Sequence, residues 1–253
     1  MCGIVGIVAK HRHGFSRNQL EVFEDLLYAD AVRGGDSTGA FSVNLKNHVR
    51  MVKQAVNPGI FMSTQSYKSF GDNIVRDNKI VIGHNRKATF GAISSKNAHP
   101  FSDGKIVLVH NGFIANHKEL SGKENVDVDS ESIVKVLSEE KDIVKSLDKL
   151  CGAYAIVWYN HSTKKLFLAR NDARTLAVAH TDEHMFIASE IDMLKWILNR
   201  HKETIKSIVD IPDHDVWTIS FDPFKIVSEK IPNVKTVFTN DVRFDPAFSP
   251  LEG

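Results

Sequence analysis

Cys2, directly behind the initiator methionine, is the residue of this chain best suited to chemistry. Methionine is normally removed when the next residue is small, and its removal would leave Cys2 with both a thiol and a free α-amine. The thiol is a strong nucleophile, and an α-amine with a pKa of about 7.7–8.0 can accept its proton near neutral pH. Cys2 could therefore be nucleophile and base in one residue. The plainer alternative is that it only opens an N-terminal strand.

Two later stretches supply polar groups that could act on a substrate. Arg86 follows a short β-branched run, and its planar guanidinium suits the capture of a carboxylate through two parallel hydrogen bonds. Asn111 and Gly112 follow another such run, and a side-chain amide beside a glycine N–H can point at one oxygen. The alternatives are a surface arginine and an ordinary Asn-Gly hairpin turn.

The elements that would position these residues are mostly strands, with helices in sequential pairs rather than in strict alternation. This order indicates two mostly antiparallel sheets with helices outside them. The predicted strands are residues 2–9, 40–45, 48–52, 79–83, 105–109, 153–159, 166–169, 177–180, 185–188, 216–221 and 225–230. The predicted helices are residues 17–31, 59–70, 130–138, 142–150 and 191–199.

Composition narrows the class of protein. The chain has 253 residues, 42% hydrophobic and 25% charged, with a net charge of +1, so no electrostatic grip on nucleic acid or a membrane is expected. Two cysteines make no disulfide framework, and Cys151, in an apolar run, should be a buried core thiol. No signal peptide or membrane span is predicted, which favours a cytoplasmic location. The twelve histidines do not cluster with cysteine or carboxylates, so no metal site is expected.

Four landmarks occur in a fixed order along the chain. They are CGIVG at 2–6, RGGDSTG at 33–39, GHNRKATFG at 83–91 with NAHPF at 97–101, and HNG at 110–112. This set resembles the class II glutamine amidotransferases, the N-terminal nucleophile family. It is most similar to the glutaminase domain of glucosamine-6-phosphate synthase, over residues 2–231. The resemblance implies an α+β fold of four layers, αββα, with two mostly antiparallel sheets between helical layers, and no cofactor.

The resemblance also implies roles for the candidate residues. Cys2 would attack the side-chain amide of L-glutamine, and Asn111 with Gly112 would form the oxyanion hole. Arg86 would hold the α-carboxylate of glutamine, with Thr89 nearby.

The substrate ammonium group would be bound by an acid at Asp129. That residue could instead cap a helix, and Asp127 is a rival for the role. Arg33 and Asp36 would shape the site beside the nucleophile, or would simply form a structural salt bridge. His99 would hold its loop against the site.

The chain departs from the family pattern at three places. Lys87 and Phe90 replace a tryptophan and a histidine, and Gly35 replaces an aromatic residue. The tryptophan caps bound glutamine and helps couple the glutaminase to its partner domain, so the change puts that coupling in doubt. Lys87 stays among the candidate substrate-binding residues.

Three functions remain open from the sequence. The first is a glutaminase that passes ammonia to a separate synthase subunit. The second is a stand-alone amidase for another small amide, and the third is a non-catalytic protein that senses glutamine. Residues 232–253 form a tail with Phe238, Phe244 and Phe248. This tail could dock on a partner or pack on the chain's own surface.

Overall fold

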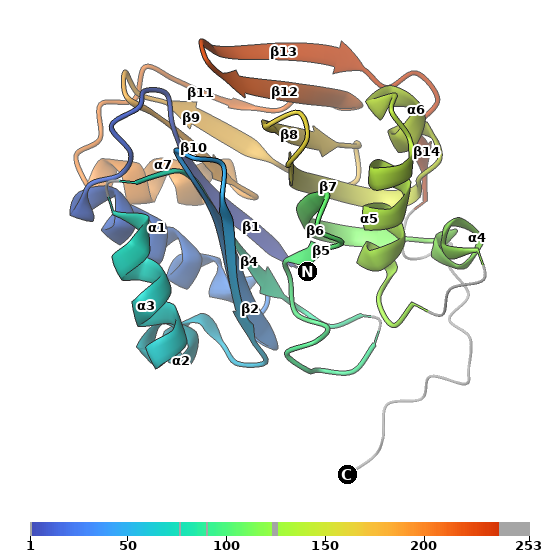
Figure 1. Ribbon diagram of the computed structural model, residues 1–253, viewed down its shortest axis with the longest axis horizontal. Helices are drawn as coiled ribbons and strands as arrows, with labels where there is room; N and C mark the ends of the chain where they lie inside the picture. Colours follow the sequence, from blue (N-terminus) through green and yellow to red (C-terminus); the bar gives the residue numbers. More distant parts are fainter. Residues whose placement is uncertain (1, 76, 90, 123–125, 238–253) are drawn as a thin grey trace.

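The fold consists of four layers, two β-sheets packed face to face between two layers of helices (Figure 1). The structure is a computed structural model, and it describes residues 2–75, 77–89, 91–122 and 126–237. The four-layer α+β prediction is confirmed.

The first sheet carries the N-terminal strand near its centre. Its order is β11-β9-β10-β1-β4-β2-β3, and every neighbouring pair is antiparallel. The strands are β1 (Gly3–Ala9), β2 (Ser37–Asn44), β3 (Val49–Gln54), β4 (Asn78–Arg86), β9 (Ala177–His180), β10 (His184–Ala188) and β11 (Ser207–Asp210). Strand β1 is buried along its whole length and pairs with β4 from Gly3 onward, so the residue that precedes it lies at the end of a paired strand.

The second sheet has the order β13-β12-β8-β7-β6-β5, with antiparallel neighbours, and a short β14 pairs parallel to β7. Its strands are β5 (Phe101–Ser102), β6 (Ile106–Ile114), β7 (Cys151–Asn160), β8 (Lys165–Arg170), β12 (Asp215–Phe221), β13 (Phe224–Lys230) and β14 (Lys235–Thr236).

Helices cover the outer face of each sheet (Figure 1). Against the first sheet lie α1 (Arg17–Ala29), α2 (Pro58–Ser63), α3 (Gln65–Ile74) and α7 (Ile191–Arg200), with a 3-10 turn at Asp30–Val32 after α1. On the side of the second sheet lie α4 (His117–Ser121), α5 (Asp129–Glu139) and α6 (Ile143–Asp148). A third apolar cluster fills the space between the sheets, with Ile4 and Val8 of β1 facing Val107 and Val109 of β6. Among the described residues, no helix combines the length and the apolar character that crossing a bilayer requires.

Two strands extend further than the sequence patterns indicate. Strand β4 continues through His84 to Arg86, and β6 continues through Asn111 and Gly112 to Ile114. Asn111 is paired with Ala155 and Gly112 with Tyr154 of β7, so the hairpin-turn alternative for Asn111-Gly112 is wrong. Pairing along β7 determines the backbone here, because it satisfies the hydrogen-bonding groups of both buried strands.

Other differences are local. The single helix predicted for 59–70 is two helices, because Thr64 ends α2 and its side chain accepts a hydrogen bond from the Tyr67 N–H at the start of α3. Cys151 is half-buried rather than part of the core. The short strands β5, β11 and β14 were not predicted. Phe238, Phe244 and Phe248 lie outside the described residues, so docking by the tail stays a prediction.

Candidate active site

Most of the candidate residues from the sequence meet in one pocket where β1, β4 and β6 end. The pocket encloses a cavity of about 10 Å³, roughly the space that one water molecule needs. Its lining comprises Cys2, Arg86, Lys87, Thr89, His99, His110, Gly112, Val128, Asp129 and Ser130. Side chains from the first sheet, the second sheet and helix α5 therefore converge on a single small space.

The Cys2 side chain is held against the chain that leaves β4. Its Sγ accepts a hydrogen bond from the Lys87 backbone N–H at 3.4 Å, and only 8% of the residue is exposed. Burial raises the pKa of the Cys2 thiol, while the Lys87 N–H and the positive charge of Arg86 act in the opposite direction. The thiol therefore needs a proton acceptor beside it to become a nucleophile.

Arg33 and Asp36 fix the main chain around Cys2. The Arg33 Nε donates to the Cys2 carbonyl oxygen at 3.0 Å, and the guanidinium forms an ion pair with Glu190. Asp36 accepts a hydrogen bond from the Ala88 N–H at 2.9 Å and lies 3.2 Å from the Lys87 Nζ. Both residues are thus in ion pairs, and both also contact the backbone on either side of the thiol.

Gly34, between them, allows the two segments to touch. A Cβ at this position would lie 2.6 Å from the backbone nitrogen of Lys87, closer than side-chain contacts allow. The glycine is required by this close approach.

Arg86 and Asp129 are the buried charged residues of the pocket. Arg86 is 2% exposed and Asp129 is 4% exposed. Asp129 is the first residue of α5, and its Oδ2 accepts a hydrogen bond from the Ile114 N–H of β6 at 2.8 Å. Burial raises the pKa of the Asp129 carboxyl to about 6, against the opposing effects of this hydrogen bond and of Arg86.

Asp127, the rival position, is not among the residues that line the pocket. It is exposed, and its carboxylate lies 2.5 Å from the Lys96 Nζ. The residue before α5 that takes the N-cap position is Val128. The geometry therefore favours Asp129 as the acid beside Arg86.

Asn111 lies between two pocket residues on β6, His110 and Gly112. Its side chain projects from the face of β6 that carries Val107 and Val109, toward the first sheet. Asn111 is 1% exposed, and within the described chain neither its Oδ1 nor its Nδ2 has a hydrogen-bond partner. A buried amide without partners costs free energy, so this group is suited to a ligand oxygen.

Gly112 has a backbone that other residues cannot adopt. Its φ is +147°, and a Cβ would lie 1.8 Å from the Ala153 carbonyl oxygen of β7.

Three histidines pack behind the pocket with Ser130 between two of them. The Ser130 Oγ is 3.0 Å from the His99 Nε2 and 3.1 Å from the His110 Nδ1. The His84 Nε2 donates to the His110 carbonyl oxygen at 2.8 Å. Burial lowers the pKa of all three, to about 3 for His84 and His110. They are therefore neutral, and the contact of His99 with Ser130 joins the loop at 97–100 to α5.

Sequence reasoning overlooked His84, His110 and Ser130, and also a polar group under β1. Asp30 is fully buried and its Oδ2 accepts a hydrogen bond from the Asn85 Nδ2 at 3.0 Å. The signal was present, because Asp30 continues the apolar stripe of α1 that Leu20, Phe23 and Leu27 define.

In the part of the chain described, no set of His, Cys, Asp and Glu side chains is arranged to hold a metal ion.

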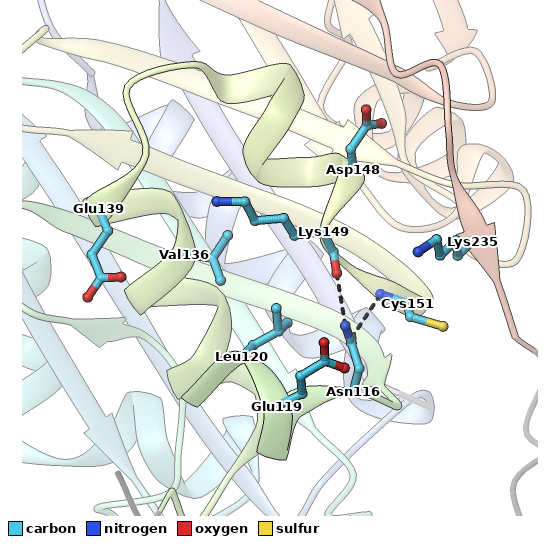
Figure 2. A pocket seen from close by; sticks show the side chains of 9 residues that line it. All are labelled: Asn116, Glu119, Leu120, Val136, Glu139, Asp148, Lys149, Cys151 and Lys235. Atoms are coloured by element: carbon cyan, nitrogen blue, oxygen red, sulfur yellow. Dashed lines mark hydrogen bonds between the residues drawn. The ribbon is translucent and has the colours of Figure 1, made fainter. Parts of the chain in front are cut away.

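A larger cavity lies away from the nucleophile, between α4, α5, α6 and the strands β7 and β14 (Figure 2). Its volume is about 620 Å³, and Cys151 stands at its edge. Asn116 is one of the residues that line it. Its Nδ2 donates to the Lys149 carbonyl oxygen at 2.9 Å, and its Oδ1 accepts from the Cys151 N–H at 3.0 Å. None of the site residues predicted from the sequence lines this cavity.

Comparison with known proteins gives the same family as the motifs. A family of glutamine amidotransferase domains matches residues 84–196. The glutamine–fructose-6-phosphate aminotransferase of Sulfolobus acidocaldarius is 32% identical over 210 residues, which is 76% of this chain and 33% of that protein. The enzyme of the same name from Helicobacter pylori is 30% identical over 255 residues, 93% of this chain and 38% of that protein. The chain thus matches little more than a third of the length of these relatives.

Solved structures share the fold. Glutamine phosphoribosylpyrophosphate amidotransferase from B. subtilis superposes with a TM-score of 0.70 at 19% identity, covering 91% of this chain and 49% of that one. A glutamine aminotransferase class-II domain protein from Silicibacter pomeroyi has a TM-score of 0.54 at 10% identity, covering 90% of this chain and 99% of that one. With Cys2 opening the central strand and the motifs gathered at its end, the chain belongs to the class II glutamine amidotransferases, the N-terminal nucleophile family.

Proposed function

We propose that this chain hydrolyses the side-chain amide of L-glutamine and delivers ammonia to an acceptor bound by a separate synthase subunit. The observation that supports it most is the pocket in which the Cys2 thiol, the Arg86 guanidinium and the Asp129 carboxylate meet. A guanidinium and a carboxylate together match the α-carboxylate and α-ammonium of a free amino acid. The Cys2 thiol lines the same pocket, so it would act on the side chain of the bound amino acid.

Catalysis begins at Cys2 after removal of Met1. The α-amine takes the thiol proton, and the thiolate adds to the amide carbon of glutamine. The negative charge that forms on the amide oxygen is stabilised by the Asn111 side chain and the Gly112 N–H, two donors on β6. The protonated α-amine gives its proton to the leaving nitrogen, so ammonia departs and a thioester remains. Water, deprotonated by the same amine, cleaves the thioester and releases glutamate.

Arg33 and Asp36 act by position. Arg33 holds the Cys2 carbonyl oxygen and Asp36 holds the Ala88 N–H in the segment that contacts the thiol, and together they keep the nucleophile in line with the oxyanion donors. The pocket of about 10 Å³ cannot hold glutamine, so substrate binding requires the side chains of Lys87 and Thr89 to move aside. Both residues are exposed, which places them at the mouth of the pocket.

The ammonia acceptor is the second part of the proposal. The relatives reported above are named as aminotransferases of fructose 6-phosphate, and this chain covers 33% and 38% of them. Transfer of nitrogen to a sugar phosphate is therefore the first acceptor chemistry to test, with a cytoplasmic synthase as the partner.

The test of hydrolysis is an intact mass of the purified protein before and after a diazo-ketone analogue of glutamine, with Cys2→Ala as the control. We expect a parent mass without Met1 and one adduct that is absent from Cys2→Ala. A mass that keeps Met1 and gains no adduct would refute the catalytic role and favour glutamine sensing. Loss of Met1 without an adduct would indicate either a site that needs its partner subunit or a different amide substrate.

A further inference from the structure

Asp30 is a buried carboxyl group that the proposed chemistry leaves unused. It begins the 3-10 turn after α1 and has no solvent-exposed surface. Its side chain lies directly on the backbone of Gly3, the residue after the nucleophile, where a Cβ would be 1.8 Å from the Asp30 Oδ2. The neighbours before it on α1, Leu26 and Leu27, belong to the apolar core. A carboxyl group at this position is costly to bury.

Two polar side chains face Asp30. Asn85, which is paired with Gly3 across β1 and β4, donates from Nδ2 to the Asp30 Oδ2 at 3.0 Å and to the Leu27 carbonyl oxygen at 2.8 Å. The Asp30 Oδ1 accepts no hydrogen bond within the described residues, and the Arg33 Nε lies 4.0 Å from it.

Arg33 connects Asp30 to the nucleophile. Its guanidinium lies between the carboxyl groups of Asp30 and Glu190, and its Nε–H points at the Cys2 carbonyl oxygen, 3.0 Å away. Glu190 is 45% exposed and screened by solvent, whereas Asp30 is fully buried. Asp30 therefore acts on the guanidinium from the buried side, where its charge is less screened than that of Glu190.

We propose that Asp30 is a positioning residue for the nucleophile: ionised, it fixes Arg33 against the Cys2 carbonyl, and protonated, it releases Arg33 and with it the alignment of Cys2. This inference rests on the proposed function for its effect on glutamine. The effect of Asp30 on Cys2 does not depend on the substrate, so it can be measured on the protein alone.

The inference has a pH dependence that follows from the surroundings of Asp30. Burial raises the pKa of Asp30 to about 7, with Glu190 acting in the same direction and with Asn85 and Arg33 opposing it. The charged groups that act on Asp30 are Arg33 on its own turn and Glu190 after β10. Asp30 thus changes charge in the range where the α-amine also titrates.

The first experiment is the pH profile of kcat/KM for glutamine hydrolysis in wild type, Asp30→Asn and Glu24→Gln. Each group that must be deprotonated makes kcat/KM fall about tenfold per pH unit below its pKa. We expect Asp30→Asn to lower kcat/KM about 10-fold or more at pH 8. Below pH 7, kcat/KM of the variant should fall less steeply than that of wild type, by a factor of about ten per pH unit. Glu24 is the matched control, because it is a half-buried carboxyl on α1 whose pKa burial also raises, with Tyr67 as its partner. Glu24→Gln should keep the wild-type steepness.

The second experiment needs no glutamine. In a Cys151→Ser background, the rate of Cys2 alkylation by iodoacetamide is followed by intact mass from pH 5 to pH 9. We expect the rate to rise more steeply than about tenfold per pH unit below pH 7, and to return to about tenfold in Asp30→Asn. Asn85→Ala removes the donor that lowers the Asp30 pKa, so it should move the steep region to higher pH.

These outcomes separate the two proposals. A protein that alkylates with the expected profile but does not hydrolyse glutamine supports Asp30 and contradicts the proposed function. Equal steepness in wild type and Asp30→Asn, in both assays, overturns the role of Asp30 while leaving glutamine hydrolysis untouched. Should Asp30→Asn fail to fold, the wild-type profile and its shift in Asn85→Ala decide the question alone.

Discussion

The two ends of the layer between the sheets differ sharply, although the same strands form both. At one end Val8, Ile80 and Val107 fill the space with apolar side chains. At the other end these strands bring Cys2, Arg86 and Asn111 to the same layer. Several of the buried polar atoms that have no partner in the described chain lie near this second end, on Asp30, His84, His99, His110 and Asn111.

The comparison teaches how this fold separates stability from function. Apolar packing at one end contributes free energy of folding in proportion to the area buried. Buried carboxyl and amide groups at the other end reduce it, because each loses water without full compensation. Changes at the apolar end should therefore act on unfolding, and changes at the polar end on the reaction.

The largest effect on folding is expected from Ile80→Ala at the apolar end. Ile80 is fully buried between the sheets, so truncation leaves a cavity and should lower the free energy of unfolding by about 2–5 kcal/mol. Urea denaturation measures this loss, and kcat per folded molecule should stay within about twofold of wild type. A large fall in kcat with unchanged stability would show that the two ends are coupled.

Asn111→Ala tests the polar end, where a substitution should slow the reaction and leave folding unchanged. Loss of one oxyanion donor should lower kcat for glutamine hydrolysis by about 10²–10³-fold. The free energy of unfolding should not fall, because the Asn111 amide has no partner to lose among the described residues. Asn111→Ala with normal kcat would exclude this amide from the oxyanion hole. The same urea titration that serves Ile80→Ala provides the stability control.

The pH dependence of stability should show the penalty of burying Asp30. In the folded chain Asp30 keeps its proton up to about pH 7, whereas the unfolded chain releases it near 3.8. The folded state thus binds more protons in this range, and its stability from this group falls as pH rises from about 4 to about 7. Asp30→Asn removes that fall.

At pH 8 Asp30→Asn should be more stable than wild type by about 2–3 kcal/mol, since the pKa rise corresponds to about 4 kcal/mol and the amide still buries polar atoms. Near pH 4 wild type is free of the cost of burying a charge while the amide penalty remains, so Asp30→Asn should there be about 1–2 kcal/mol less stable than wild type. Denaturant titrations at both pH values measure it, with Glu24→Gln as the control on the same helix. A destabilised Asp30→Asn at pH 8 would mean that the carboxylate is a net contributor to folding.

The smallest effect is expected from Arg12→Ala. Arg12 follows β1 at the apolar end and donates from Nε and Nη2 to the Asp222 Oδ1 at 3.0 and 2.9 Å. Both side chains are largely exposed, so removing the pair should change the free energy of unfolding by less than about 1 kcal/mol. A change of several kcal/mol would show that this end depends on more than apolar packing.

The sequence was sufficient for the family, the layered fold and the residues that meet around Cys2, because the relevant motifs are short and lie at strand ends. It was not sufficient for the strand extensions, since polar residues such as His84 and Asn111 are typical of loops unless pairing with a neighbouring strand holds them. Asp30 shows the same limit. Its spacing from Leu27 indicated burial, but its charge favoured solvent, and only the contacts of Asn85 and Arg33 explain how a carboxyl group lies there.

The pairing of β14 has a practical consequence for handling the protein. The Val237 N–H donates to the Gly152 carbonyl oxygen at 3.3 Å, and Gly152 is paired with Ile114, two residues beyond Gly112. A tag fused to the amino end would block the α-amine of Cys2. A tag fused after Val237 would also emerge near the catalytic end of the molecule. The turn between β2 and β3 at the apolar end, where Leu45 and Lys46 are exposed, is a better place for a purification handle or a surface anchor.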